Sequence, residues 1–228
     1  MSSLDAQSIP IRVDDLHLVS GLLQQPRNTR ACFVLAPGAG AGMGHPFMAA
    51  VAMGLEALGI ATLRYQFPYM EQRSRRPDRP ALCHATVRAA VSTAATYLPT
   101  VPLFAGGKSF GGRMTSQTQA LGPLPAVAGL IFLGFPLHPA GRPADDRAAH
   151  VADISIPMLF VQGTRDELAH LDKLRPVIER RGPLATLHLV ADADHAFHVP
   201  ARTGRTDAQV LQELLRVSRD WIDSVLYR

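Results

Sequence analysis

The sequence predicts a single α/β domain over residues 1–228, in which a mostly parallel sheet is covered by helices on both faces. Three observations lead to this prediction. Short apolar runs alternate with segments of helical periodicity almost from end to end. Most of these runs are hydrophobic at consecutive positions, as buried parallel strands are. The composition, 47% hydrophobic and 18% charged, favours one ordered core, and no linker or internal repeat divides the chain.

Seven short runs are predicted to be strands, because each is apolar and is bounded by glycine, proline or polar turn residues. The first is expected to bend at Gly21, and the second ends at Pro37 and Gly38. In such a sheet, functional residues gather in the loops that follow the carboxyl ends of the strands. The expected strands cover residues 16–26, 31–38, 60–68, 101–107, 126–136, 156–163 and 185–192.

Five segments carry helical spacing and are predicted to cover the sheet. The first is expected to end at Gly59, and Pro176 is expected to kink or shorten the fourth. The last is amphipathic, and its apolar face consists of Val210, Leu214, Val217, Trp221 and Val225. The expected helices cover residues 45–59, 81–98, 113–121, 167–180 and 207–227.

Charge and cysteine content exclude several classes of protein. The net charge is +4 and the pI is about 9.5, but no basic block adjoins aromatic residues, so we expect no nucleic-acid partner. Cys32 and Cys83 are too few for a disulfide framework or a metal cluster, and they fit a reducing compartment. The N-terminal residues do not resemble a signal peptide, and no apolar stretch is long enough to span a membrane. We therefore expect a cytoplasmic protein with no membrane partner.

The stretch FAGGKSFGGRM (104–114) has two interpretations. A phosphate-binding loop requires G-x-x-x-x-G-K-[ST], in which the first glycine would stand at position 102. That position is Pro102, so the spacing excludes a phosphate loop. The second interpretation is G-x-S-x-G, a turn that presents a nucleophilic serine.

The second interpretation fits the context, because residues 107–111 lie between an expected strand and an expected helix. Ser109 would occupy a strained position in a tight turn, and Gly107 and Gly111 would leave room for it. The flanking Gly106 and Gly112 widen this clearance. The alternative is an ordinary glycine-rich turn in which Ser109 only caps the helix.

A serine nucleophile needs a base, and the base needs an orienting acid. In folds that present serine on such a turn, the chain order is Ser, then Asp or Glu, then His. Asp166 follows the expected strand 156–163, and His195 follows the strand 185–192, so order and placement both match.

Each partner has rivals nearby. Glu167 adjoins the acid, and Asp192 and Asp194 share the loop of the histidine, where we expect them to shape it. His198 is a second candidate base. The other histidines, including His84, His150 and His188, are expected to be structural or solvated.

An oxyanion hole needs two backbone N–H groups. One should belong to Phe110, the residue after the nucleophile, and the other to the glycine-rich loop 35–44. Ala39 is the first candidate there and Gly40 the second. A plain glycine-rich loop is the alternative.

These motifs together resemble the dienelactone-hydrolase-like branch of the α/β-hydrolase superfamily, which includes testis-expressed protein 30 and the hydrolase-like domain of a chromatin-complex subunit. The resemblance covers roughly residues 31–226 and rests on LAPGAGAGMGHPFM, RYQFPYMEQRSRRPDRP, AGGKSFGGRM, GFPLHPAGRP, FVQGTRDE and ADHAF. It implies an α/β-hydrolase fold with Ser109, Asp166 and His195 as the triad. It also implies an oxyanion loop at residues 38–40.

Two departures limit what the resemblance implies. Many superfamily members carry His-Gly where this chain has Pro37-Gly38, which affects the identity of the second donor. True dienelactone hydrolases use a cysteine where this chain has Ser109, so their substrate is not carried over. Some members of the branch act as scaffolds.

The mouth of the expected site is open. Residues 134–153 are too few for a cap domain and are expected to form a loop or one small helix, which suits small or extended substrates. Candidate substrate-binding residues are Gly38, Gly40, Lys108 and Arg73. The arginine-rich loop 69–80, with Arg64 and Arg142, could attract an anionic ester. Alternatively, it is a solvated loop whose arginines pair with Glu71 and Asp78.

The function predicted from the sequence is a serine hydrolase that cleaves a small acyl ester through an acyl-enzyme, with no metal or organic cofactor. It would act as a monomer or homodimer on a small-molecule acyl substrate. The alternative function is a non-catalytic binding module on the same scaffold.

Overall fold

The structure is a computed structural model, and it describes residues 6–227. Its centre is an eight-stranded sheet in the order β1-β2-β4-β3-β5-β6-β7-β8. The strands from β4 to β8 in this order run parallel, whereas β1 pairs with β2, and β2 with β4, in antiparallel fashion. The strands are β1 (Gln7–Arg12), β2 (Leu18–Gln24), β3 (Ala31–Ala36), β4 (Ile60–Tyr65), β5 (Leu103–Lys108), β6 (Val127–Leu133), β7 (Met158–Gly163) and β8 (Ala185–Val190).

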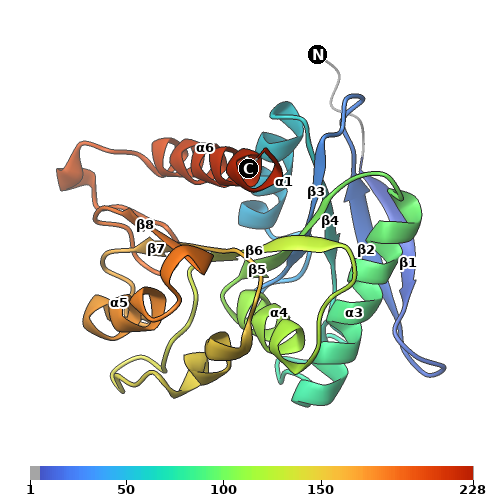
Figure 1. Ribbon diagram of the computed structural model, residues 1–228, viewed down its shortest axis with the longest axis horizontal. Coiled ribbons are helices and arrows are strands. Elements are labelled where there is room, and N and C mark those ends of the chain that lie inside the picture. The colour runs from blue at the N-terminus through green and yellow to red at the C-terminus, as the bar shows by residue number, and fades with distance from the viewer. Residues whose placement is uncertain (1–5, 228) are drawn as a thin grey trace.

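Helices cover both faces of this sheet (Figure 1). Helices α1 and α6 pack on one face, and α3, α4 and α5 with the 3₁₀ helix η1 pack on the other. The helices are α1 (Pro46–Ala57), α2 (Pro68–Glu71), α3 (Pro80–Tyr97), α4 (Phe110–Leu121), α5 (Leu171–Glu179) and α6 (Asp207–Leu226). Three 3₁₀ helices complete the structure: η1 (Asp146–Asp153), η2 (Gly182–Leu184) and η3 (Ala201–Thr203).

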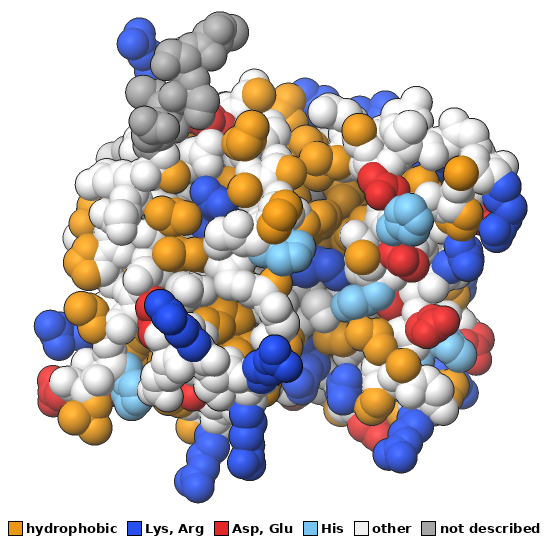
Figure 2. Space-filling model, turned by 180° about the vertical axis from the view of Figure 1, so that it is seen from behind, with side chains coloured by type: hydrophobic (Ala, Val, Ile, Leu, Met, Phe, Trp, Pro, Cys, Tyr) orange, Lys and Arg blue, Asp and Glu red, His pale blue; other side chains and the backbone are white. Residues whose placement is uncertain are grey.

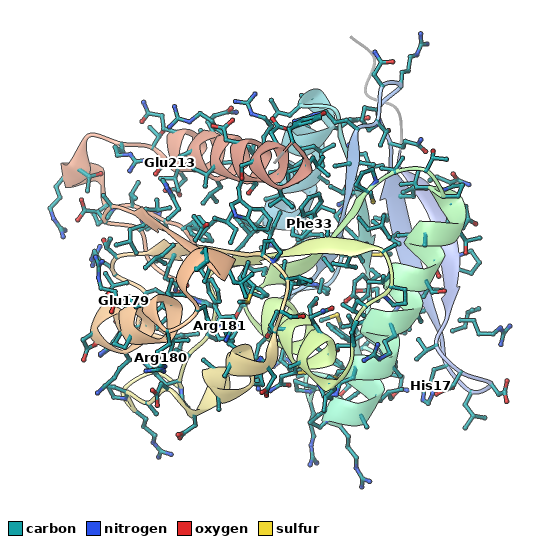
Figure 3. All side chains as sticks on the ribbon, in the orientation of Figure 1. His17, Phe33, Glu179, Arg180, Arg181 and Glu213 are labelled. Carbon is teal, nitrogen blue, oxygen red and sulfur yellow. The ribbon has the colours of Figure 1, made fainter. Side chains whose placement is uncertain are left out.

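The core lies between the sheet and these two helical layers. Phe33 of β3 is fully buried near the middle of the molecule (Figure 3). The expected apolar face of α6 faces this core, because Val210, Leu214 and Trp221 are buried there. Trp221 also packs edge-to-face on Phe104 of β5, which ties the last helix to the strand that leads to the candidate site. The prediction of a mostly parallel sheet with helices on both faces is therefore confirmed.

Several elements differ from the sequence-based expectation. Helix α5 begins at Leu171, four residues after its expected start, and contains Pro176 in its interior. Strand β1 was not predicted, because Pro10 argues against a strand interior; the structure places it at the edge of the sheet, where proline is tolerated. The short helix α2 lies within what was expected to be a loop. Helix α4 begins at Phe110, three residues before its expected start, and so includes Gly111 and Gly112.

The segment that would carry a cap domain is short, as expected. Between β6 and β7 the chain forms only η1, whose buried residues are Ala148 and Val151. No large cap therefore covers the carboxyl edge of the sheet.

The turn between β5 and α4 is packed closely against its neighbours. A Cβ atom added at Gly106 would lie 1.9 Å from the carbonyl oxygen of Ile131 in β6. A Cβ atom at Gly107 would lie 2.2 Å from the oxygen of Ala36 in β3. Both glycines have positive φ, 151° and 154°, which residues with side chains rarely adopt. The glycines thus give clearance for the turn, as the sequence predicted.

This packing predicts the effect of adding one methyl group. Gly106→Ala should lower the free energy of unfolding by at least about 3 kcal/mol, because the methyl group meets backbone that cannot move aside. Gly44→Ala is the control, since an added Cβ there meets no atom within 4 Å, and its effect should stay below about 0.5 kcal/mol. Urea unfolding followed by circular dichroism measures both. Equal stability of the two variants would contradict the packing argument.

Candidate active site

Ser109 stands between the last residue of β5 and the first residue of α4. Its φ and ψ are 49° and −116°, a strained combination for a residue with a side chain. Its hydroxyl makes no capping hydrogen bond to α4. Instead, Ser109 Oγ lies 2.8 Å from His195 Nε2. The interpretation of Ser109 as a simple helix cap is therefore wrong, and the hydroxyl is presented to a base.

His195 also contacts Asp166, so the hydrogen bonds that begin at Ser109 extend to a buried acid. His195 Nδ1 lies 2.7 Å from Asp166 Oδ2, and the aspartate side chain is fully buried. The same carboxylate accepts hydrogen bonds from the backbone N–H of Leu168, at 2.8 Å, and from the side-chain amide of Gln162. With both oxygens occupied, the carboxylate is fixed, and it holds the imidazole with Nε2 directed at the serine.

The rival residues have other partners. Glu167 is exposed, and Asp194 Oδ1 accepts the N–H groups of Ala196 and His198, which shapes the histidine loop as expected. The His198 ring bonds to Asp207, at 2.9 Å from Nδ1 to Oδ2. Of the candidates in these loops, the structure brings only Asp166 and His195 to Ser109.

Within residues 6–227, His195 is the one histidine that hydrogen-bonds to Ser109 Oγ. His188 of β8 contacts Glu213 of α6, which Figure 3 labels, with 2.7 Å between Nε2 and Oε1. His84 contacts Gln117, and His150 contacts Ser116.

The glycine-rich loop lies beside the serine. A Cβ atom added to Gly38 would lie 3.9 Å from the Ser109 Cβ, so this loop directly adjoins the turn that carries the nucleophile. The loop folds back through a hydrogen bond from Ala41 N to Gly38 O, and the Tyr69 hydroxyl donates to Ala39 O at 2.8 Å. The N–H group of Phe110, at the start of α4, has no acceptor within the helix. The roles of Ala39 and Phe110 as oxyanion donors remain predictions.

Lys108 is directed at the histidine loop. Its Nζ donates to the carbonyl oxygen of His195 at 2.6 Å and lies 5.3 Å from the centre of the Phe197 ring. Burial lowers the pKa of Lys108 to about 8, against the opposing effect of Asp166 and Asp194. A substrate-binding role for Lys108 remains a prediction, while this contact to His195 was missed at the sequence level.

Two expectations about the arginines are wrong. Arg64 does not border a cleft: it is buried, and it donates to Met43 O at 3.1 Å and to Gln24 Oε1. Nor do Glu71 and Asp78 pair with the arginines of their loop. Glu71 accepts the backbone N–H of Ser20, and Asp78 that of Tyr69. These two acids therefore anchor the loop 69–80 to neighbouring backbone.

Arg73 lies close to the glycine-rich loop. It lines a cavity of about 600 Å³ together with Ala39, Gly40 and Arg75. The structure thus brings two of the four candidate substrate-binding residues, Gly40 and Arg73, to one hollow. Figure 2 shows a hollow near the centre of one face, with histidine side chains beside it and basic side chains projecting at the lower edge.

Two further contacts around the candidate site, those of Gln162 and Tyr69, were also not predicted from the sequence. Gln162 is buried on β7 and joins Asp166 to the backbone N–H of Phe135. One polar residue in the apolar run MLFVQG was the signal that could have revealed it, since buried polar groups need partners. Tyr69 carried no comparable signal.

Other chemistries find little support in the described residues. Burial raises the pKa of both Cys32 and Cys83 to about 12, so neither thiol is an activated nucleophile. Within residues 6–227, no three His, Cys, Asp or Glu side chains gather as metal ligands would. None of the helices described is both long and apolar enough to cross a membrane.

Solved structures resemble this chain over nearly its full length. A dienelactone hydrolase from Anabaena variabilis superimposes with a TM-score of 0.79 at 18% identity, covering 98% of this chain and 99% of that one. A lidless α/β serine hydrolase from Xanthomonas campestris gives 0.73 at 21% identity, covering 95% of each chain. A serine hydrolase homologue from Coxiella burnetii gives 0.75 at 18% identity, covering 95% of this chain and 99% of that one. At these identities, the likeness establishes the fold.

The family is established by a separate comparison of the sequence. The model of the alpha/beta hydrolase domain family matches residues 29–223, which include all the residues from β4 to β8. The chain belongs to the α/β-hydrolase superfamily.

Proposed function

We propose that the protein is a serine hydrolase that cleaves a small carboxylic ester. The observation that carries this proposal is the continuous hydrogen-bond chain from Asp166 through His195 to Ser109. A binding module has no need of a strained serine aligned with a buried acid and a base. The lidless carboxyl edge of the sheet supports a small or extended acyl substrate over one that requires an enclosed lipid pocket.

The reaction follows from this arrangement. Ser109 Oγ attacks the ester carbonyl while His195 Nε2 takes the hydroxyl proton, and Asp166 stabilises the resulting imidazolium. The N–H groups of Phe110 and Ala39 stabilise the oxyanion. His195 then protonates the leaving alcohol, and the acyl group remains on Ser109. Water, deprotonated by His195, cleaves the acyl-enzyme to release the acid.

Lys108 would act in this reaction by positioning the base. The ammonium group of Lys108 donates to the backbone carbonyl of His195, while Asp166 contacts the ring. His195 is therefore held at both its backbone and its side chain. Because Lys108 precedes Ser109 in the chain, this contact would also keep the Ser109 hydroxyl and the His195 ring at a constant distance from each other.

Ser109→Ala should abolish labelling by a fluorophosphonate probe and lower kcat for 4-nitrophenyl acetate by on the order of 10³-fold or more, because the acyl-enzyme cannot form. Ser92→Ala, at an exposed position on α3, is the control and should label like wild type. Gel fluorescence and release of 4-nitrophenol measure the two effects. Wild-type protein that neither labels nor hydrolyses would favour a non-catalytic binding module.

Asp166→Asn should lower kcat on the order of 10³- to 10⁴-fold with little change in KM, since the amide no longer stabilises the imidazolium. Glu167→Gln changes the adjacent exposed acid and should retain activity near that of wild type. Steady-state kinetics on the same ester separates the two carboxylates. A greater loss of activity in the Glu167 variant would show that Glu167, and not Asp166, is the acid of the triad.

Lys108→Met should lower kcat by about 10-fold or more below pH 8, because it removes a charged hydrogen bond to His195 O. As pH rises through about 8, the wild-type amine loses its proton and its bond weakens, so the deficit of the variant should shrink. Lys173→Met alters the other lysine of the chain, which is exposed, and serves as the control. A deficit that does not vary with pH would point to a purely structural role.

A further inference from the structure

A second cavity, separate from that of Arg73, lies between α3, α4 and η1. Its volume is about 640 Å³. Phe110, Met114 and Leu121 of α4 give it an apolar wall, and Arg113 and His84 contribute polar groups. Phe110 carries both a side chain in this cavity and the N–H group assigned to the oxyanion hole. The cavity therefore begins at the residue that follows the nucleophile.

Arg113 is a cation without a partner in this cavity. Within residues 6–227, its side chain makes no hydrogen bond or ion pair, and its Nε is buried with no acceptor. The guanidinium makes a cation–π contact with the Phe110 ring, whose centre lies 5.8 Å from the guanidinium carbon. Burial, and then the proximity of Arg147, lowers the pKa of Arg113. The two terminal nitrogens of Arg113 are not enclosed in the same way, so they remain available to a ligand that enters the cavity.

A buried Nε without an acceptor also occurs in Arg64 and Arg181, but those two arginines, like Arg88, have hydrogen-bond acceptors at their terminal nitrogens. Arg88 donates to the carbonyl oxygens of Thr118, Gly122 and Pro123, and thereby closes the end of α4. Arg64 donates to a carbonyl and to an amide. These side chains have structural roles that account for their position. Among residues 6–227, no oxygen accepts a hydrogen bond from the Arg113 side chain.

The neighbouring imidazoles supply hydrogen-bond donors without charge. Burial lowers the pKa of His84, and it lowers that of His150 to about 4, so both rings are neutral at pH 7. His84 Nε2 lies 3.3 Å from Gln117 Oε1, and when the ring donates to this oxygen the amide nitrogen of Gln117 is left as a donor. Arg113 is thus the one cation among the described residues that line the cavity.

We infer that this cavity binds a carboxylate at the far end of the acyl chain of an ester whose carbonyl is attacked by Ser109. The inference rests on the proposed function and names its substrate class: half-esters of dicarboxylic acids. Side chains of a helix lean toward its N-terminus, so the guanidinium of Arg113 lies over Phe110 rather than farther along α4. Arg113 stands four residues, about one helical turn, after Ser109. An acyl chain that runs from the serine across the Phe110 ring would therefore reach the guanidinium.

The charges around the cavity favour a carboxylate over a phosphate. A guanidinium offers two parallel N–H groups, which match the two oxygens of one carboxylate. Asp78 and Asp153 also line the cavity, and two negative charges would repel a dianion more strongly than a monoanion. The apolar residues of α4 suit the methylene groups of the connecting chain.

The test compares two substrates on each enzyme. Mono-4-nitrophenyl adipate carries the free carboxylate, and 4-nitrophenyl methyl adipate is the same molecule with that group capped. Wild type should show a higher kcat/KM for the free acid. Arg113→Met should lower the ratio of the two kcat/KM values by about 10-fold or more, because a charge-assisted hydrogen bond is lost. Arg113→Lys should give an intermediate ratio, since it keeps the charge but not the paired donors.

Arg175→Met is the matched control, and Arg73→Met tests the rival cavity. Arg73 lines the other cavity, beside Gly40, and Arg175 is exposed on α5. Both variants should keep the ratio within about threefold of wild type. A ratio that falls in the Arg73 variant but not in the Arg113 variant would move the carboxylate site to the first cavity and overturn the inference. A wild-type ratio of one or below would also overturn it.

Binding to an inactive protein separates this inference from the proposed function. In Ser109→Ala protein, titration with monomethyl adipate should shift the Arg113 Nε–H resonance in ¹H–¹⁵N spectra and saturate. Dimethyl adipate should leave this resonance unchanged. In Ser109→Ala/Arg113→Met, which lacks the resonance, neither ligand should cause saturable shifts of the backbone N–H groups of Phe110 and Met114, which line the cavity. Saturable shifts without hydrolysis by wild type would retain the site and reject the esterase. Hydrolysis without such shifts, at up to millimolar ligand, would retain the esterase and reject the site.

Discussion

The close approach of the β5–α4 turn to the flanking strands is the constraint on which the candidate site depends. Gly106 and Gly107 pass within contact distance of carbonyl groups on β6 and β3, and Gly111 lets the first turn of α4 pack against the end of β3. Only this approach leaves Ser109 at positive φ with its hydroxyl directed away from the helix. The strain at one residue is therefore maintained by three positions that have no side chain.

The second requirement is a carboxylate that stays fixed in a buried place. Desolvation of Asp166 would be unfavourable if its oxygens lacked donors, but Gln162, Leu168 N–H and His195 provide them. Gln162 also binds Phe135 N–H, which begins the loop after β6. The acid is thereby connected to the ends of two strands, and the imidazole is oriented by a carboxylate that is tied to the sheet.

Sequence reasoning predicted the elements whose signals are local. Buried strands, amphipathic helices and the order Ser109, Asp166, His195 follow from periodicity and from the rule that loops after parallel strands meet at one edge. It missed β1, since Pro10 is acceptable only at a sheet edge and the edge is a property of the whole sheet. It also missed the bond from Lys108 to His195, because a contact between residues 87 apart in sequence depends on how two loops finally pack.

The two cations nearest Ser109 along the chain differ in what they contact, and this difference is the basis of the different roles proposed for them. Lys108 precedes the serine, and its charge is met by a carbonyl, an aromatic ring and nearby acids. Arg113 follows one turn later and, among the described residues, its charge contacts an aromatic ring and no hydrogen-bond acceptor. A cation such as Lys108, whose hydrogen bonds and charge are already met by the protein, can position His195 but gains little free energy from binding a ligand. A cation without a protein partner gains most when an anion binds, so under the inference drawn above the discrimination between charged and neutral acyl chains is the role of Arg113.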